Sequence, residues 1–359
     1  MSSAPIVSFV VPCYKYAHLL GECVGSILVQ DYGNYEVLIM DNCSPDNTPE
    51  VAQSFQDARV RHIRNDSNLG AEENFNKGLT LSRGKYVWVL SADDLLRSPS
   101  VLGRFVTVME QNADLGFVFC RAMEFDGEKE RGVIWWADCG DQDFTWNDST
   151  FGLRLIEFNC IAFSCVLLRR ECLNRVGMFP IDLPFAADWY LWIMLALNYG
   201  VCYLAEPMVF SRVHKDSLTS QQSQEYARIC LGDELGLLWR VGHEAKLAQL
   251  ANLRDACRSA LIHRAKRCLM EGVSEAEFAE ILQSRIPDME TSKDLRALAY
   301  RDLAEQQYSK GEYVAATQSY RLALRARPFH PGTLAKYLFM RTGRIGIRTR
   351  RWAHQVRKL

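Results

Sequence analysis

The sequence predicts an α/β domain, a sheet with helices on both faces, followed by an all-α domain. Two observations support this fold class: short apolar runs alternate with helical patterns in the first part of the chain, and strand patterns stop near residue 222. A chain of 359 residues is long enough for two or three domains. We therefore expect an α/β domain at residues 1–222 and a helical domain at residues 223–359.

Strands and helices alternate regularly at the beginning of the first domain. The expected strands are short apolar runs at residues 6–11, 35–40, 60–63 and 86–90. An apolar stripe predicts a helix at residues 18–30, and a second helix at about residues 71–81 is bounded by the NLG turn before it and Gly84 after it. This alternation favours a parallel doubly wound sheet with right-handed crossovers, in which the first strand lies between the second and the fourth.

The remainder of the first domain has weaker patterns. We expect strands at residues 117–120, 163–168, 201–204 and 208–213, and a helix at residues 188–197. Residues 124–148 are rich in Trp and acidic residues, lack periodicity, and are expected to form a loop-bearing excursion. From about residue 223 onwards all patterns are helical.

Two adjacent carboxylates, Asp93 and Asp94, directly follow the fourth apolar run. Such a pair needs solvent, a cation or a hydrogen-bond donor. A loop that only caps the next helix would explain these two residues alone. In the expected winding, however, other polar or aromatic strand ends share the same carboxyl edge, namely Pro12, Tyr14, Asp41 and Asn42. Open α/β sheets bind ligands at that edge, so we interpret it as a binding site.

Composition narrows the class of protein. A formal net charge of −1 argues against bulk electrostatic binding to nucleic acid, so no nucleic-acid partner is expected. The twelve cysteines include no Cys-x-x-Cys pair, which fits free thiols in a reducing compartment. The N-terminus lacks signal-peptide features, and no apolar segment is convincing as a membrane span. We expect a cytoplasmic protein.

Seven short patterns occur in order along the first domain. They are residues 11–14 (VPCY), 38–48 (LIMDNCSPDNT), 68–70 (NLG), 91–94 (SADD), 164–170 (SCVLLRR), 187–192 (ADWYLW) and 212–217 (RVHKDS). Together they resemble the nucleotide-sugar-binding half of family 2 glycosyltransferases, whose GT-A fold is a mixed sheet with helices on both faces. The resemblance covers about the first 220 residues and implies a hexosyltransferase-type enzyme.

The resemblance implies a nucleotide-sugar donor. Pro12 and Tyr14 match the positions that frame the base, and the Tyr14 ring suits stacking, although a core Tyr at a strand end is the alternative. Asn42 stands where the family usually has the second Asp of the pair that begins at Asp41. This departure leaves a UDP or dTDP sugar only as a preference. Asn68 is assigned to the same donor pocket.

The resemblance also implies a divalent cation, Mg²⁺ or Mn²⁺. Asp93 and Asp94 match the family's ribose-hydroxyl acceptor and metal ligand respectively, while Ser91 replaces an acid that is common in the family. Arg212 and His214 match a loop that closes over the diphosphate. There His214 would complete the metal's shell and Arg212 would neutralise phosphate charge. A histidine without a ligand role is the alternative.

Asp188 matches the family's general base. It opens an expected helix, where the helix dipole favours the ionised carboxylate. Ala187 replaces a Glu that is frequent in the family, so Asp188 must be the base if there is one; a plain N-terminal helix carboxylate is the alternative. The implied reaction inverts the anomeric configuration as an acceptor hydroxyl attacks and the metal stabilises the leaving diphosphate.

The resemblance implies a saccharide or lipid-linked saccharide acceptor, as in bacterial surface polysaccharide or glycoconjugate synthesis. Ser91 and Ala187 leave a second hypothesis open. The α/β domain could be a catalytically impaired nucleotide-binding scaffold that acts through its helical protein-interaction domain.

The helical domain resembles one tetratricopeptide repeat at about residues 297–330, with helices near 297–310 and 313–326. A single repeat must stack on neighbours. It could be a helical cap, or a surface for a protein partner or for self-association. From residue 325 the chain has no Asp or Glu, and its basic end could lie on the inner face of a membrane as a peripheral contact. A solvated last helix is the alternative.

Overall fold

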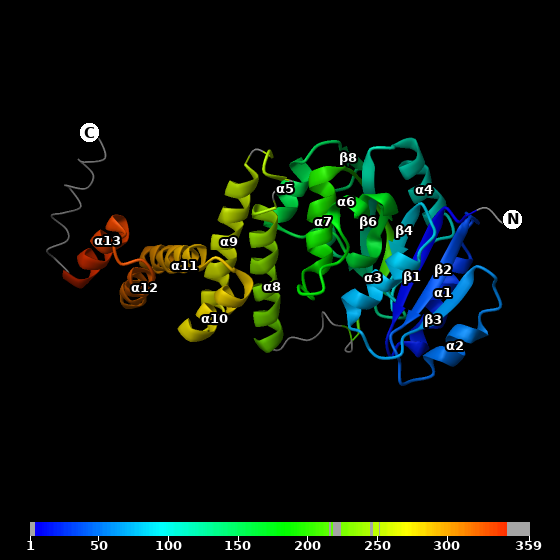
Figure 1. The fold of residues 1–359 in the computed structure, drawn as a ribbon, viewed down its shortest axis with the longest axis horizontal. Helices are drawn as coiled ribbons and strands as arrows, with labels where there is room; N and C mark the ends of the chain where they lie inside the picture. Colours follow the sequence, from blue (N-terminus) through cyan, green and yellow to red (C-terminus); the bar gives the residue numbers. More distant parts are fainter. Residues whose placement is uncertain (1–3, 215–216, 218–223, 245–246, 251, 343–359) are drawn as a thin grey trace. The chain divides into compact units, whose positions relative to one another are not determined.

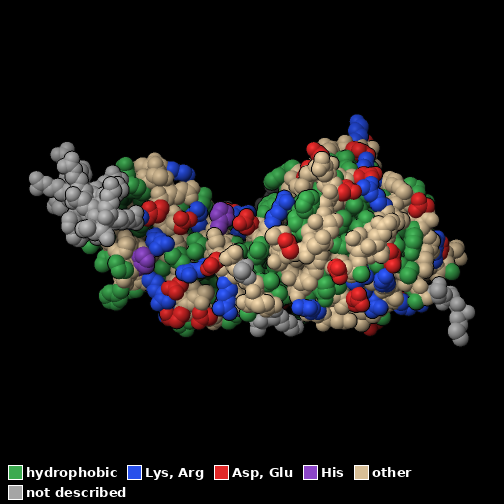
Figure 2. All heavy atoms as spheres, turned by 90° about the horizontal axis from the view of Figure 1, so that it is seen from above, with side chains coloured by type: hydrophobic (Ala, Val, Ile, Leu, Met, Phe, Trp, Pro, Cys, Tyr) green, Lys and Arg blue, Asp and Glu red, His purple; other side chains and the backbone are tan. Residues whose placement is uncertain are grey.

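The computed structural model describes residues 4–214, 217, 224–244, 247–250 and 252–342. The chain divides into two compact units, Met1–Gln222 and Ser223–Leu359 (Figure 1). Every strand among the described residues belongs to the first unit. On the face drawn in Figure 2, basic and acidic side chains are interspersed on both units.

Four parallel strands form one half of the sheet. Their order is β3-β2-β1-β4, so the first strand lies between the second and the fourth, which confirms the expected winding. They are β1 (Val7–Cys13), β2 (Tyr35–Asp41), β3 (Val60–Arg64) and β4 (Tyr86–Val89). β1 extends past Pro12, where we expected it to stop. The side of β1 that faces β4 tolerates Pro12, because β4 ends at Val89 and the missing N–H of Pro12 therefore interrupts no pairing between these two strands.

The other half of the sheet is mixed. β9 (Val166–Arg169) runs antiparallel between β4 and β6 (Leu115–Phe125), and β10 (Gly200–Arg212) runs parallel to β6. β5 (Leu95–Leu96) pairs antiparallel with β10. The expectation of a purely parallel sheet is therefore wrong beyond β4, whereas the mixed sheet that the family resemblance implied is confirmed.

Two expectations about this half need correction. The two strands expected at residues 201–204 and 208–213 are one strand, β10, with register shifts around Pro207. The excursion at residues 124–148 contains two short strands that pair with the sheet, β7 (Glu130–Val133) and β8 (Phe144–Trp146), and the 3-10 turn η1 (Trp135–Ala137) between them. Its short strands lie at the rim, which explains their weak apolar alternation.

Helices cover both faces of the sheet (Figure 1). They are α1 (Ala17–Leu28), α2 (Thr48–Ser54), α3 (Ala71–Leu81), α4 (Val101–Gln111), α5 (Thr150–Glu157), α6 (Leu173–Val176) and α7 (Ala187–Asn198). Between β8 and α6 the 3-10 turns η2 (Phe163–Cys165) and η3 (Arg170–Cys172) flank β9. α7 was expected to be amphipathic, but it is buried almost all round because β6, α5 and α6 pack on it.

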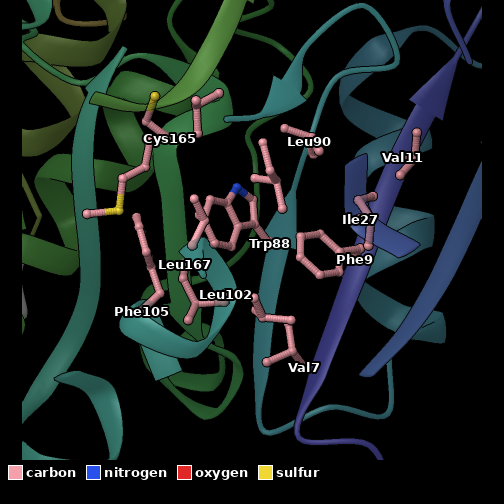
Figure 3. Close-up of a cluster of buried hydrophobic side chains, with 14 of the residues drawn as sticks. Val7, Phe9, Val11, Ile27, Trp88, Leu90, Leu102, Phe105, Cys165 and Leu167 are labelled. Atoms are coloured by element: carbon pink, nitrogen blue, oxygen red, sulfur yellow. The ribbon is translucent and has the colours of Figure 1, made fainter. Parts of the chain in front are cut away.

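A buried aromatic stack fixes β4, the strand that leads to the two carboxylates (Figure 3). The Trp88 ring stacks on Phe9 with centroids 5.6 Å apart and packs on Phe105 at 4.4 Å. Its indole N–H donates to the carbonyl of Ser164 at 2.7 Å. Burying each such ring stabilises the fold by roughly 1.5–3 kcal/mol. The strand end that carries Asp93 is thus set by the core.

The second unit is helical throughout its described residues. It contains α8 (Gln224–Gly242), α9 (Leu253–Met270), α10 (Glu275–Arg285), α11 (Met289–Ser309), α12 (Tyr313–Ala326) and α13 (Pro331–Thr342). α11 and α12 pack on each other around a turn at Gly311, whose φ of 82° suits glycine. They match the two helices of the repeat-like pattern, except that α11 begins earlier. The basic end of the chain, residues 343–359, lies outside the described residues.

None of the helices in the described ranges combines the length and the apolar character needed to cross a bilayer.

Candidate functional site

The carboxylates of Asp93 and Asp94 lie at the carboxyl edge of β4, as expected. Asp94 is 8% exposed, and its Oδ1 accepts the backbone N–H of Arg212 at 2.9 Å. The hydroxyl of Ser164 also hydrogen-bonds this carboxyl group. Burial, together with the neighbouring charge of Asp93, raises the pKa of Asp94 to about 8. A cation at this point would favour the ionised form.

His214 meets this pair from the end of β10. Its Nε2 lies 3.0 Å from Oδ2 of Asp93, and the edge of the Tyr16 ring packs against the imidazole with centroids 5.4 Å apart. Two carboxylates and one imidazole therefore lie close together, although Asp94 is turned toward Arg212. Within the described part of the chain, no three His, Cys, Asp or Glu side chains form a ready-made metal cluster.

Arg212 holds in place the turn after β4 that carries Asp93 and Asp94, here called the carboxylate turn. Its Nε donates to the carbonyl of Asp93 at 3.0 Å, and its Nη2 donates to Glu22 on α1 at 2.5 Å. The guanidinium also lies over the Phe125 ring, 5.0 Å from its centroid. With a side chain only 7% exposed, Arg212 has its charge engaged inside the protein. No pattern in the sequence points to Glu22, which looks like any polar position on a helix.

The Asn42 amide is saturated with hydrogen bonds to the turn that follows β3. Its Nδ2 donates to Oδ1 of Asn68 and to the carbonyl of Gly70, both at 2.9 Å. Its Oδ1 accepts from the Nδ2 of Asn65 at 3.0 Å and from the N–H of Leu69 at 2.9 Å. An amide has two donors and two acceptor lone pairs, so Asn42 fixes the shape of this turn.

Asn65 extends the same network, and sequence reasoning missed it. Its Nδ2 also donates to Asn74 Oδ1 at 2.8 Å, while Lys77 donates to its Oδ1 at 2.7 Å. The amide of Asn74 in turn donates to the carbonyl of Met40 at the end of β2. Three asparagines within ten residues around the NLG turn were the available signal.

Asp41 is fully buried and engaged. Its carboxylate accepts the N–H of Ser44 at 2.8 Å, forms an ion pair with Arg64 at 2.6 Å, and lies 3.3 Å from Nε2 of His62. The Asp41 side chain therefore organises the loop that follows β2. Its assignment to the donor pocket remains a prediction.

Tyr14 lies just beyond β1 at the same edge and is 37% exposed, as a stacking ring requires. The next residue, Lys15, has a φ of 64° and Cys43 has a φ of 59°, so two non-glycine residues occupy the left-handed region beside the site. The N–H of Lys15 donates to the hydroxyl of Ser44 at 3.2 Å, which joins the loops after β1 and β2.

Asp188 lies in the first turn of α7, where its Oδ1 accepts the N–H of Trp189 at 2.7 Å. Burial raises the pKa of Asp188 to about 6. The end of α7 lies near the amino end of β6, because the N–H of Gly200, two residues after α7, donates to the carbonyl of Asp114, which directly precedes β6. Because α7 therefore runs antiparallel to β6, its first turn points toward the carboxyl edge that carries Asp93.

Solved structures share this fold. TarS from S. aureus, crystallised with UDP-GlcNAc, has a TM-score of 0.55 at 15% identity, and the match covers 85% of this chain and 92% of TarS. The mannosyltransferase PcManGT from Pyrobaculum calidifontis, solved in complex with GDP-Man and Mn²⁺, has a TM-score of 0.50 at 19% identity, over 88% of this chain and 86% of that one. The sheet, its helices and its polar carboxyl edge define a GT-A fold.

Sequence comparisons identify the family. The model of glycosyl transferase family 2 matches residues 8–177. The putative teichuronic acid biosynthesis glycosyltransferase TuaG of Bacillus subtilis is 30% identical over 221 residues, which are 61% of this chain and 83% of TuaG. The chain belongs to glycosyl transferase family 2 and is a glycosyltransferase.

Two further relatives differ in how much of them is matched. WfgD of Escherichia coli, a UDP-Glc:alpha-D-GlcNAc-diphosphoundecaprenol beta-1,3-glucosyltransferase, is 25% identical over 62% of this chain and 83% of WfgD. The glycosyltransferase GlyG of Streptococcus pneumoniae is 34% identical over 112 residues, which are 31% of this chain and 37% of GlyG.

Proposed function

We propose that the chain transfers a hexose from a nucleoside diphosphate donor to an acceptor hydroxyl, with inversion, in bacterial surface polysaccharide or glycoconjugate synthesis. The observation that supports this proposal is the contact of His214 with Asp93, next to Asp94, at the sheet edge where the exposed Tyr14 also follows β1. Metal-dependent sugar transfer needs carboxylates and a base-stacking surface at one edge.

The donor would bind with its base on Tyr14 and Pro12. Asn42 and Asn68 would shape the wall of this pocket through their hydrogen bonds to the turn after β3, with Asp41 supporting the adjoining loop. TarS was crystallised with UDP-GlcNAc, which supports a uridine donor for this chain, and a dTDP sugar is the second candidate. Arg212 would act mainly by holding the Asp93 turn rather than by reaching the diphosphate.

The donor set around Asp94 fits Mg²⁺ or Mn²⁺. Carboxylate oxygens and an imidazole are chemically suitable, and such ions usually take their remaining ligands from phosphate and water. Asp94 and His214 would hold the ion, and Asp93 would accept the ribose hydroxyls. When bound, the cation would neutralise charge that develops on the departing diphosphate. The Mn²⁺ bound to PcManGT, which shares the fold, supports this choice.

Asp188 would be the general base. A pKa of about 6 leaves the carboxylate ionised at neutral pH, yet basic enough to take the proton of an acceptor hydroxyl as its oxygen forms the new bond. The ionised base and the acceptor oxygen would approach from the side opposite the diphosphate, which inverts the anomeric carbon.

The acceptor would be a saccharide or a lipid-linked saccharide, the class to which the diphosphoundecaprenol-linked acceptor of WfgD belongs. A lipid-linked acceptor would place the reaction at the inner face of the membrane, with the basic residues 343–359 as the peripheral contact. The helical unit would serve as a docking surface for a protein partner or for self-association, which its exposed Phe329 and Val314 support.

Release of nucleoside diphosphate tests this proposal. The chain is incubated with UDP and dTDP sugars, Mn²⁺ and saccharide acceptors. We expect turnover in the wild type, none above background in Asp188→Asn or Asp94→Ala, and full turnover in Asp114→Asn, an exposed matched control at the opposite sheet edge. Nucleotide binding without turnover, with all acceptors supplied, would instead favour the scaffold hypothesis.

A further inference from the structure

Two thiols from separate segments meet in the first unit. The Sγ atoms of Cys139 and Cys160 lie 3.4 Å apart, in hydrogen-bond contact, although 21 positions separate them in the sequence. Cys139 follows η1 in the excursion between β6 and β8, whereas Cys160 follows α5. Both are free thiols; Cys139 is half-buried and Cys160 is 2% exposed.

Hydrogen bonds hold the loop that carries Cys139, and they therefore position its thiol against that of Cys160. The N–H of Cys139 donates to the hydroxyl of Tyr203 at 3.3 Å, and that hydroxyl donates to the carbonyl of Gly140 at 2.9 Å. Arg121 donates to Asp138 at 2.8 Å, next to the thiol. These bonds tie the loop to β6 and β10.

The two thiols differ chemically. The hydrogen bond with Cys160 and the nearby guanidinium of Arg154 lower the pKa of the Cys139 thiol. The same hydrogen bond and burial raise the pKa of Cys160. Cys139 is therefore the more accessible thiol and the one whose thiolate is favoured, while Cys160 lies buried behind it. A lowered pKa, partial exposure and a neighbouring thiol that can form a disulfide are the features of an oxidisable cysteine.

We propose that Cys139 and Cys160 form a modification site that a hydroperoxide converts into a disulfide. The Cys139 thiolate attacks one oxygen of hydrogen peroxide, the O–O bond breaks, and hydroxide leaves and is protonated to water. The sulfur of Cys160 then attacks the sulfenic acid, the S–O bond breaks, and hydroxide leaves with the Cys160 proton as a second water. Two thiols are oxidised and one peroxide is reduced.

The disulfide would act on the carboxylate turn through η2. A disulfide needs an Sγ–Sγ distance of about 2.05 Å, so the loop and the residues after α5 must draw together by about 1.3 Å. Ser164 lies four positions beyond Cys160, accepts the N–H of Ser91 and hydrogen-bonds Asp94. We expect the bond to lower the transfer rate severalfold; this second step rests on the proposed function.

Peptide mapping tests the modification directly. The folded protein is treated with a small excess of hydrogen peroxide, alkylated, digested and analysed by mass spectrometry. We expect a Cys139–Cys160 disulfide before any other cysteine reacts, and its loss with dithiothreitol. Cys160→Ser stops the sequence at a sulfenic acid on Cys139, which dimedone traps, whereas Cys139→Ser gives no adduct on Cys160. Cys230→Ser, a half-buried cysteine in the helical unit, is the matched control.

The outcomes separate the two steps. Oxidised protein in which Cys139 and Cys160 stay unlinked overturns the modification site, whatever the transfer activity. A mapped disulfide with an unchanged transfer rate overturns the link through Ser164. Because mapping needs no turnover, failure of the proposed function would leave the first step measurable.

Discussion

The imidazole of His214 lies 3.0 Å from the carboxylate of Asp93, although 121 positions separate the two residues in the sequence. This contact joins the segment after β10 to the turn after β4, where we propose that Asp94 and His214 hold a cation. We expect His214→Ala to lower kcat/KM about 10–100-fold, because a neutral methyl group cannot contribute to the cation's shell. Steady-state rates against Mn²⁺ concentration check this. A His214→Ala enzyme with an unchanged Mn²⁺ dependence would remove His214 from the metal site.

Metal removal should abolish transfer without unfolding the protein. Asp94 is turned toward Arg212, so the ligand set is not assembled before the nucleotide supplies phosphate oxygens. We expect EDTA to stop turnover and Mn²⁺ or Mg²⁺ to restore it, with the thermal midpoint of the nucleotide-free protein unchanged by either. A midpoint that falls with EDTA alone would mean that the ion is bound before the donor.

Transfer should rise with pH through about 6 and then level off. The pKa of Asp188 is raised to about 6 by burial, and only the ionised carboxylate accepts a proton. A profile of kcat/KM from pH 5 to 8 at constant ionic strength measures this. In Asp188→Asn the rate should be about 10²–10⁴-fold lower and the ascending limb should be absent. The same limb in the variant would assign it to another group.

Asp188→Asn should also stabilise the protein above pH 6. The folded-state pKa lies above the usual value near 4, so the fold favours the protonated acid and loses stability as pH rises from about 4 to 6. An amide avoids this cost and can still accept the N–H of Trp189. We expect a gain of about 1–2 kcal/mol at pH 8, discounted for partial exposure, and none at pH 4. Urea unfolding at both pH values measures the difference.

Asn42→Asp restores the residue that the family usually has and should nevertheless destabilise the fold. A carboxylate would face the Asn68 oxygen and the Gly70 carbonyl, to which the Asn42 amide now donates. Loss of two buried donors costs about 2–4 kcal/mol. Asn68→Ala, which removes an exposed partner, is the control and should cost less. An equally stable Asn42→Asp protein would show that the turn re-forms its hydrogen bonds.

Local pattern predicted part of this fold well. α3 begins and ends at the residues expected from the NLG turn before it and Gly84 after it, and β1 lies between β2 and β4 as the alternation predicted. β9 could not be oriented in the same way. An apolar run can pair with its neighbour in either direction. β9 runs antiparallel to β4 because η2, just before it, returns the chain to the carboxyl edge beside Ser91.

The site was predicted by position more than by role. Asp93 and His214 meet at the sheet edge, and Asp94 contacts Arg212 there, because strand ends determine location; the roles of these residues remain predictions. The engagement of Arg212 with Glu22, and the saturation of Asn42, follow from partners that no local pattern specifies. The spacing of residues in the sequence predicts which side chains lie at the edge of the sheet. Their hydrogen-bond partners come from distant segments and are seen only in the three-dimensional structure.

Ser164 connects the apolar core with the acidic turn. Its carbonyl accepts the Trp88 indole at the centre of the apolar stack, and its hydroxyl hydrogen-bonds Asp94. A single residue therefore contacts both the apolar core and the proposed metal ligand. Random mutagenesis that is scored only for lost activity should recover substitutions in the aromatic cluster around Trp88 as well as in the acidic residues. Second-site mutations that restore activity to the aromatic-cluster variants should lie at neighbouring hydrophobic positions.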